Sequence, residues 1–324
     1  MKKILITGCA GFIGYKVCEL FLKNNYKVIG IDNFDPYYDL SLKEYRINYL
    51  KNYENFDFIL SDIRDKEGLR NIFKIYNFEG IINLSAKAGV RNSLLNPKDY
   101  FEVNVIGTLN LLELMIEFNV RKIVLASTSS IYAGQKPPFR EDMKCDNMLS
   151  PYAVSKKSAE NLIWTFHYLY GISAIVLRYF TVYGPAGRPD MSIFRFVYWA
   201  INDNEIIIYG DGSQRRSFTY IDDIAIGTYL AYQLEGFEII NLGNDEDNKL
   251  IDVIKIIEKI LNKKLKIKYE PFNKADLYET KADITKAKSI LNWEPKVKIE
   301  EGLRMTIDWF LSNNIKISLW SFQR

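Results

Sequence analysis

The chain has 324 residues, 48% of them apolar and 26% charged, which is typical of a globular protein with one large domain or two unequal ones. Its net charge is only +3 with lysines and arginines scattered, so the sequence suggests no nucleic-acid partner. No apolar run approaches the roughly 20 residues of a membrane span. The stretch before the first glycine is too short for a signal-peptide core, so we expect no membrane partner.

Cysteine and histidine are both scarce. The three cysteines, Cys9, Cys18 and Cys145, are odd in number and lack the spacing of metal ligands. They are typical of free thiols in a reducing compartment, which predicts a cytoplasmic location. His167 is the only histidine. A multi-histidine centre is therefore excluded, and no metal is expected.

The first 32 residues have the order strand, glycine loop, helix, strand. Residues 2–7 predict a strand, an amphipathic helix follows the glycines, and residues 27–31 predict a second strand that ends at Asp32. Such a loop lets the backbone approach a pyrophosphate, and an acid about 20 residues later suits a ribose 2′-hydroxyl. We therefore predict a dinucleotide site for NAD rather than NADP. Its candidate residues are Gly8, Gly11, Phe12, Ile13, Gly14, Asp32 and Asn33.

Strands and helices continue to alternate after residue 32. Strands are predicted at 56–60, 80–84, 122–126 and 173–177, and helices at about 66–76, 98–118 and 152–170. This order predicts an α/β fold with a doubly wound parallel sheet of the Rossmann type. Ligands bind beyond the carboxyl ends of such strands. The polar strand ends supply the candidates Asp62, Ile63, Leu84, Ser85, Ala86, Ser127, Thr128, Ser129, Tyr179 and Thr181.

The helix predicted at 152–170 begins with a strong signal. Ser150 is a good N-cap and Pro151 suits the first helical position. Tyr152 and Lys156 are four residues apart, so they lie on the same face of the helix and their hydroxyl and ammonium groups can approach each other. An ammonium group nearby would lower the pKa of a tyrosine. The spacing alone favours the alternative, a tyrosine packed in the core beside a solvated lysine. The dinucleotide site favours the catalytic interpretation.

The pattern changes after residue 180. Residues 183–190 predict a loop and residues 210–213 a turn, and short elements follow near 238–241, 250–262, 284–291 and 300–312. We expect a Rossmann domain at 1–180 and a smaller substrate-binding α/β lobe at 181–324, allowing for chain exchange between the lobes. Arginines at 188, 195, 215 and 216 suit a phosphate or carboxylate ligand.

Several segments together resemble the extended short-chain dehydrogenase/reductase family: residues 7–14, Asp32, 127–132, 152–156, 177–185 and 218–223. The resemblance spans essentially the whole chain and implies a nucleotide-sugar-modifying enzyme. Residues 32–39, 88–91, 181–185 and 187–191 are most similar to UDP-glucuronate 4-epimerases.

The resemblance implies roles for individual residues. Tyr152 would be the catalytic base, Thr128 its hydroxyl partner at the sugar 4-OH, and Lys156 the holder of the nicotinamide ribose. Arg188 falls near the sugar carboxylate and Arg216 at the diphosphate. Further cofactor candidates are Lys87 and Asn104, and further substrate candidates are Arg91, Ser130, Met191 and Asp276.

The implied reaction is NAD-dependent epimerisation at C4 through a transient 4-keto sugar, converting UDP-glucuronate to UDP-galacturonate. A UDP-glucose or UDP-N-acetylglucosamine 4-epimerase is the alternative. A decarboxylase or 4,6-dehydratase fits less well, because Ser129 and Ser130 stand where those relatives carry an acid. A non-catalytic NAD-sensing protein would usually have dropped Tyr152 or Lys156.

The sequence departs from the epimerase pattern at Lys87, Ala133, Ser217 and Asn273, which affects substrate contacts rather than the chemistry. The family commonly forms homodimers through a four-helix bundle, here from the helices at 98–118 and 152–170. Ordinary core packing is the alternative use of their apolar residues. The candidate contacts are Phe101, Val105, Leu109, Leu112, Trp164 and Tyr168.

Overall fold

A seven-stranded parallel sheet forms the base of the molecule. The computed structural model describes residues 1–272, 277–313 and 315–322. The sheet has the order β11-β6-β5-β4-β1-β2-β3, which confirms the predicted doubly wound fold. Its strands are β1 (Lys3–Thr7), β2 (Lys27–Asp32), β3 (Phe56–Leu60), β4 (Gly80–Asn83), β5 (Lys122–Thr128), β6 (Ser173–Tyr179) and β11 (Phe237–Leu242).

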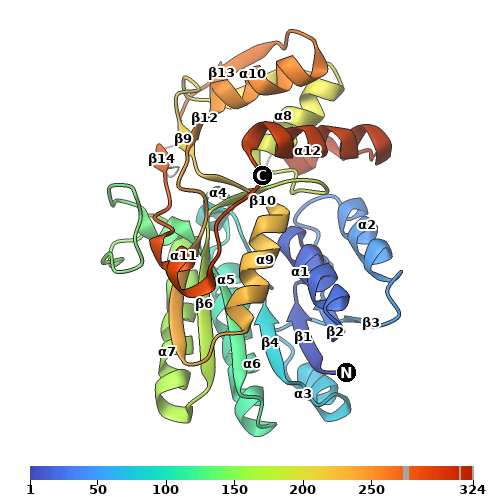
Figure 1. Cartoon of the computed structure of the whole chain (residues 1–324), viewed down its shortest axis with the longest axis vertical. Helices are drawn as coiled ribbons and strands as arrows, with labels where there is room; N and C mark the ends of the chain where they lie inside the picture. The colour runs from blue at the N-terminus through green and yellow to red at the C-terminus, as the bar shows by residue number, and fades with distance from the viewer. Residues whose placement is uncertain (273–276, 314, 323–324) are drawn as a thin grey trace.

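Helices cover both faces of this sheet (Figure 1). One face packs against α3 (Lys66–Ile75), α6 (Gly107–Glu117) and α7 (Pro151–Tyr170), and the other against α1 (Phe12–Lys23) and α9 (Ile221–Tyr232). Strands covered on both faces are mainly apolar, as in β6, where every residue is buried and residues 174–177 are all apolar. Helix α2 (Ser41–Leu50) packs beside α1.

A smaller lobe lies above the carboxyl ends of the strands (Figure 1). It contains the helices α8 (Ser192–Ile201), α10 (Leu250–Leu261) and α12 (Ile299–Asn313). Three small sheets accompany them, and α11 (Thr285–Leu291) packs against β11. The strands of these sheets are β7 (Thr181–Tyr183) with β10 (Phe218–Tyr220), β8 (Ile206–Tyr209) with β13 (Ile267–Glu270), and β9 (Arg215–Arg216) with β12 (Asn248–Lys249) and β14 (Glu279–Thr280).

The chain crosses between the two lobes more than once. It leaves the sheet after β6, builds β7 and α8, and returns with α9 and β11, which pairs with β6 in parallel. We keep the division at residue 180 as a proposal in which α9 and β11 are the exchanged elements.

Some elements differ from the sequence predictions. The single helix expected at 98–118 is α5 (Pro97–Phe101), a π-helical turn (Glu102–Ile106) and α6. Helices α2, α8 and α9 were not predicted, nor was the short α4 (Val90–Leu95). The reason is visible in α2, because its buried side includes Lys43 and Arg46 and so shows no apolar stripe.

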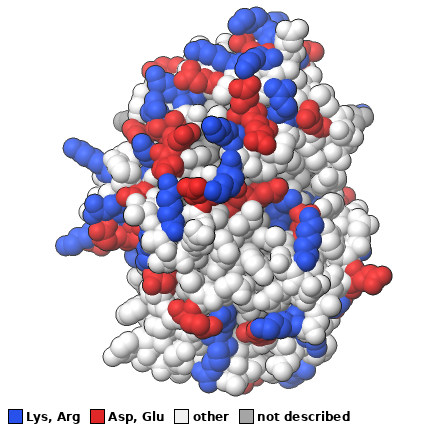
Figure 2. Space-filling model, viewed as in Figure 1, with Lys and Arg blue, Asp and Glu red and all other residues white. Residues whose placement is uncertain are grey.

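Charges of both signs are interspersed on the face shown in Figure 2 rather than gathered in a stripe. Within the described ranges, no helix is both long enough and apolar enough to cross a membrane.

Candidate active site

A cavity of about 500 Å³ opens at the carboxyl ends of the strands, beneath the smaller lobe. All but two of the predicted site residues line it. These are Gly8, Gly11, Phe12, Ile13, Gly14, Asp32, Asn33, Asp62, Ile63, Leu84, Ser85, Ala86, Lys87, Arg91, Ser127, Thr128, Ser129, Ser130, Tyr152, Lys156, Tyr179, Thr181, Arg188, Met191 and Arg216. One exception is Asn104, and Asp276 lies outside the described residues, as does Asn273.

The connection from β1 into α1 requires glycine at particular positions. Gly8 has a φ of +70°, and a Cβ there would lie 2.8 Å from the backbone of Leu84. A Cβ on Gly14 would lie 2.0 Å from the carbonyl oxygen of Gly8. The loop therefore presents bare backbone at the start of α1, and this cradle fits the pyrophosphate of a dinucleotide.

Asp32 ends β2 at the edge of the same cavity and is buried. Its Oδ1 accepts hydrogen bonds from the amide of Phe34 at 2.8 Å and from Nζ of Lys43 at 2.9 Å. Among the described residues donors reach Oδ1 only, which leaves Oδ2 for a ribose hydroxyl. Lys43 was not predicted, because nothing in the pattern of α2 marks it as buried.

Tyr152 and Lys156 lie on the first turns of α7 and both line the cavity. The helix starts as predicted, with the Ser150 hydroxyl accepting a hydrogen bond from the Ala153 amide at 3.2 Å. Burial raises the pKa of Tyr152, although a hydrogen bond with Thr128 and the charge of Arg188 oppose this. Burial also lowers the pKa of Lys156 to about 8, against the raising effect of Glu160.

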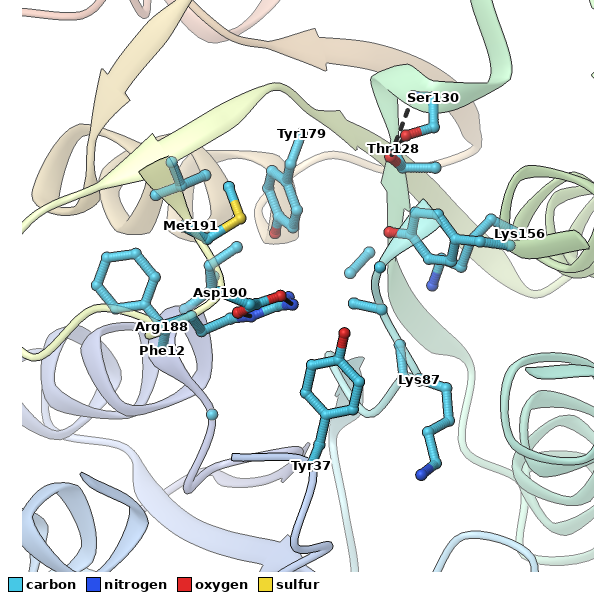
Figure 3. Close-up of a pocket in the computed structure, with 18 of the residues that line it drawn as sticks. Phe12, Tyr37, Lys87, Thr128, Ser130, Lys156, Tyr179, Arg188, Asp190 and Met191 are labelled. Atoms are coloured by element: carbon cyan, nitrogen blue, oxygen red, sulfur yellow. Dashed lines mark hydrogen bonds and ion pairs between the residues drawn. The ribbon is translucent and has the colours of Figure 1, made fainter. Parts of the chain in front are cut away.

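Thr128 ends β5 and is followed by a 3-10 turn that begins at Ser129. Its Oγ1 accepts a hydrogen bond from the Ser130 amide at 3.1 Å and donates one to the Ser130 hydroxyl at 3.1 Å. In Figure 3 Thr128 and Lys156 come from the same side of the cavity. Hydroxyl groups, and no carboxylate, therefore occupy positions 128–130.

A buried ion pair supports this side of the cavity from behind. Glu160, one turn beyond Lys156, binds Arg178 of β6 through two hydrogen bonds of 3.0 and 2.9 Å. It also accepts a hydrogen bond from the Ser127 hydroxyl at 2.5 Å. Burial alone would raise the pKa of Glu160, but Arg178 and Ser127 outweigh it and hold the pKa below its ordinary value. The sequence did not reveal this pair.

Arg188 and Asp190 enter the cavity from the opposite side, where the hydroxyl of Tyr37 also points toward the central space (Figure 3). The Nε of Arg188 lies 3.0 Å from Oδ1 of Asp190, and its Nη2 lies 2.5 Å from Oδ2. Its guanidinium carbon is 5.7 Å from the centre of the Tyr37 ring. Asp190 and Tyr37 were not among the predicted residues, and Asp190 already compensates the charge of Arg188.

The remaining arginines lie toward the smaller lobe. Arg91 stacks over the ring of Tyr209 at 4.3 Å. Arg216 donates hydrogen bonds to the carbonyl groups of Leu277 and Tyr278, which places it against the turn before β14.

Asn104 does not line the cavity but holds a loop that does. It lies in the π-helical turn, where its amide group donates to the carbonyl of Lys87 and accepts from the amide of Lys87. The side chain of Lys87 forms an ion pair with Asp35 at 2.8 Å. Ser217, another departure from the epimerase pattern, is buried and donates to the carbonyl of Asn244.

Comparison with known proteins places the chain among nucleotide-sugar enzymes. Residues 5–306 match the family model described as GDP-mannose 4,6 dehydratase. A UDP-glucuronate 4-epimerase from Thermodesulfobacterium geofontis is 55% identical over 314 residues, which cover 97% of each chain.

Solved structures agree in fold along the whole chain. The UDP-glucuronic acid 4-epimerase from Bacillus cereus, in complex with UDP-glucuronic acid and NAD, superposes with a TM-score of 0.91 at 36% identity and covers 96% of this chain and 99% of its own. The UDP-glucose 4-epimerase from Thermotoga maritima, with UDP-glucose, has a TM-score of 0.89 at 32% identity and covers 97% of this chain and 100% of its own.

Proposed function

Because the chain belongs to the GDP-mannose 4,6 dehydratase family, we propose that it is an NAD-dependent UDP-sugar 4-epimerase that converts UDP-glucuronate to UDP-galacturonate. The observation that carries this proposal is the meeting of Tyr152, Lys156 and Thr128 in one cavity with the glycine loop. The 55% identical relative supports the choice of UDP-glucuronate.

The residues at one end of the cavity fit NAD. Gly8, Gly11 and Gly14 leave room for a pyrophosphate against the start of α1, and Asp32 offers a carboxylate oxygen to a ribose and repels a 2′-phosphate. NAD held there would supply a reversible hydride acceptor for C4 of the sugar.

Tyr152 removes the proton of the 4-hydroxyl group. Lowering the pKa of a tyrosine from about 10 to 7 needs roughly 4 kcal/mol of stabilisation of the phenolate. Thr128 supplies a hydrogen bond, and the ammonium group of Lys156 is charged below a pH of about 8. The hydrogen bond with Thr128 and the charge of Arg188 oppose the effect of burial on the pKa of Tyr152 and so favour proton removal. We propose that the ammonium group of Lys156 adds to this effect.

Ser129 and Ser130 direct the outcome after oxidation. Elimination to a dehydrated sugar needs a further acid or base beside Thr128, and hydroxyl groups stand there instead. The 4-keto form of a glucuronate is a β-keto acid that can lose carbon dioxide. A charged hydrogen bond to its carboxylate is worth about 1.5–3 kcal/mol, or tenfold and more in partition between epimerisation and loss.

A neutral UDP-hexose is the second candidate substrate. The observation in its favour is the two-bonded pair of Arg188 with Asp190, because an arginine already compensated by a carboxylate attracts a second one less strongly. We retain Arg188 as the proposed carboxylate contact, with Asp190 as the group that an incoming carboxylate must share or displace.

One product-separation experiment tests the function. The purified protein is mixed with NAD and, in separate reactions, UDP-glucuronate, UDP-glucose, UDP-N-acetylglucosamine and UDP-xylose. We expect UDP-galacturonate from the first and little turnover of the others. Absence of UDP-galacturonate would contradict the proposal, turnover of UDP-glucose alone would select the second candidate, and release of carbon dioxide would indicate a decarboxylase.

We also propose a homodimer through α7 and the α5–α6 segment. Several apolar side chains there are exposed, including Trp164 at 50% and Tyr168 at 75%, together with Phe101 and Ile106. Leu112 was a candidate contact, but it is fully buried in the core and cannot touch a partner. Sedimentation of Trp164→Glu beside the unmodified chain tests the proposal.

The proposed location is cytoplasmic. The cysteines Cys9, Cys18 and Cys145 are unpaired and buried, which supports a reducing compartment.

A further inference from the structure

Arg46 is a fully buried cation between three loops of the cavity. It lies on α2, and its side chain has no exposed surface. Its Nε and Nη2 donate to the carbonyl of Ala186 at 3.0 and 2.8 Å, and Nη2 also donates to the carbonyl of Gly187 at 2.8 Å. Its Nη1 donates to the carbonyl of Ala10 at 2.9 Å and to the Tyr38 hydroxyl at 2.6 Å. A guanidinium has five N–H groups, so all of them are used.

The carbonyl partners belong to two different loops that border the cavity. Ala10 lies between Gly8 and Gly11 of the glycine loop, whereas Ala186 and Gly187 directly precede Arg188. Within the described ranges no carboxylate pairs with Arg46, so backbone carbonyl groups, the Tyr38 hydroxyl and the rings of Tyr15 and Tyr38 compensate its charge. Because a guanidinium is rigid and planar, a shift of one loop is transmitted to the other.

The loop before Arg188 needs such support. Ala186 has a φ of +54°, a left-handed conformation that costs a residue with a Cβ about 1–2 kcal/mol. Strained backbone persists only where its surroundings hold it. Here Arg46 binds the carbonyl of Ala186 twice, and the Tyr15 hydroxyl of α1 binds the neighbouring carbonyl of Pro185 at 3.0 Å. Both Arg46 and Tyr15 belong to the proposed Rossmann domain, on α2 and α1.

We propose that Arg46 is a positioning residue that couples the two ligand sites, so that a dinucleotide on the glycine loop strengthens binding of the UDP-sugar. The proposal rests on the function proposed above. When the glycine loop is fixed by a ligand, Ala10 fixes Arg46, and Arg46 fixes the turn that directs Arg188. By linkage, the UDP-sugar strengthens dinucleotide binding by the same factor.

The test is a pair of dissociation constants measured by calorimetry. UDP-glucuronate is titrated into NAD-free and NAD-saturated protein carrying Tyr152→Phe, which prevents turnover. We expect NAD to tighten binding about fivefold or more, within the usual range of coupling between sites. Adding Arg46→Lys should bring the ratio close to one, because lysine has three donors and cannot form the fork.

The matched control is Tyr49→Phe. Tyr49 lies on the same helix, but its hydroxyl donates to Glu19 and to neither loop. We expect it to leave the ratio unchanged. A purely structural Arg46 would lose stability or affinity on substitution yet keep the ratio, and that result would overturn the proposal.

Hydrogen exchange on the unmodified chain decides the matter if Arg46→Lys does not fold. NAD alone should slow amide exchange in residues 184–191, which include Ala186 and Gly187, two carbonyl partners of Arg46. Unchanged exchange in that segment overturns the coupling. These readouts do not need turnover, so a chain that couples the sites but forms no UDP-galacturonate would refute the function and leave the role of Arg46 intact.

Discussion

One wall of the cavity is built mainly from the backbone of the glycine loop, whereas another is built from charged side chains of distant segments. We call the first the cofactor wall, formed by Gly8, Gly11, Gly14 and Asp32, and the second the sugar wall, formed by Arg188, Asp190 and Arg216. The cofactor wall needs glycines whose Cβ atoms would strike the backbone. The sugar wall needs partners, and Asp190 and the carbonyl groups near Leu277 supply them. The cofactor wall therefore tolerates no added side-chain atom at its glycines. The sugar wall tolerates a change in which polar group partners each arginine.

The largest effect is expected from Gly14→Ala, which adds a Cβ atom to the cofactor wall. Its Cβ would lie 2.0 Å from the Gly8 carbonyl oxygen, so the loop must move away from the pyrophosphate position. We expect loss of bound NAD and of all turnover. Gly236→Ala is the control, because that glycine has a positive φ but open space around it. NAD content after gel filtration is the measurement, and a Gly14→Ala protein that retains NAD would contradict the expectation.

Tyr152→Phe removes the proton acceptor without touching either wall. Acid–base catalysis contributes about 10²–10⁴-fold, and we expect turnover of UDP-glucuronate to fall by that factor while NAD and UDP-sugar binding persist. Tyr168→Phe, on the exposed side of the same helix, is the matched control. Steady-state rates and calorimetry measure the two properties separately. Near-normal turnover by Tyr152→Phe would assign the base elsewhere.

The two walls also differ in how far the sequence predicted them. The cofactor wall lies within one strand–helix–strand unit, where glycine spacing and a terminal acid have a local meaning. The parallel sheet and the strand-end residues were predicted for the same reason, since alternation of elements is a local pattern. Asp190 and Tyr37 were missed because their role arises only when the chain returns to the cavity. Lys43 and Arg46 were hidden because buried charges erase the apolar stripe of α2.

Arg188→Ala tests the sugar wall, and its effect separates the two substrates. If Arg188 holds the sugar carboxylate, we expect the KM for UDP-glucuronate to rise about tenfold, the size of one charged hydrogen bond, and some carbon dioxide to form. Turnover of UDP-glucose should be little changed. Asp190→Asn is the companion variant, because it removes the competing carboxylate and should lower the KM. If Arg188→Ala raised the KM for UDP-glucuronate and for UDP-glucose equally, Arg188 would not bind the sugar carboxylate.

The smallest expected effect is a pH dependence of stability that comes from Lys156. Its pKa falls from 10.5 in the unfolded chain to about 8 in the fold because of burial. Burying the charged form costs stability below pH 8, and that cost is relieved as the pH rises through 8 and is gone above 10.5. The NAD-free protein should therefore gain about 1 kcal/mol of stability from this group between pH 7 and pH 9, since one pKa unit corresponds to 1.36 kcal/mol.

The variant Lys156→Met should lack this gain and be more stable than the unmodified chain at pH 7. Urea unfolding of both proteins at the two pH values isolates the contribution, because other titrating groups cancel in the difference. If both proteins show the same change in stability between the two pH values, burial does not destabilise the ammonium group of Lys156, and the lowered pKa of this residue is contradicted.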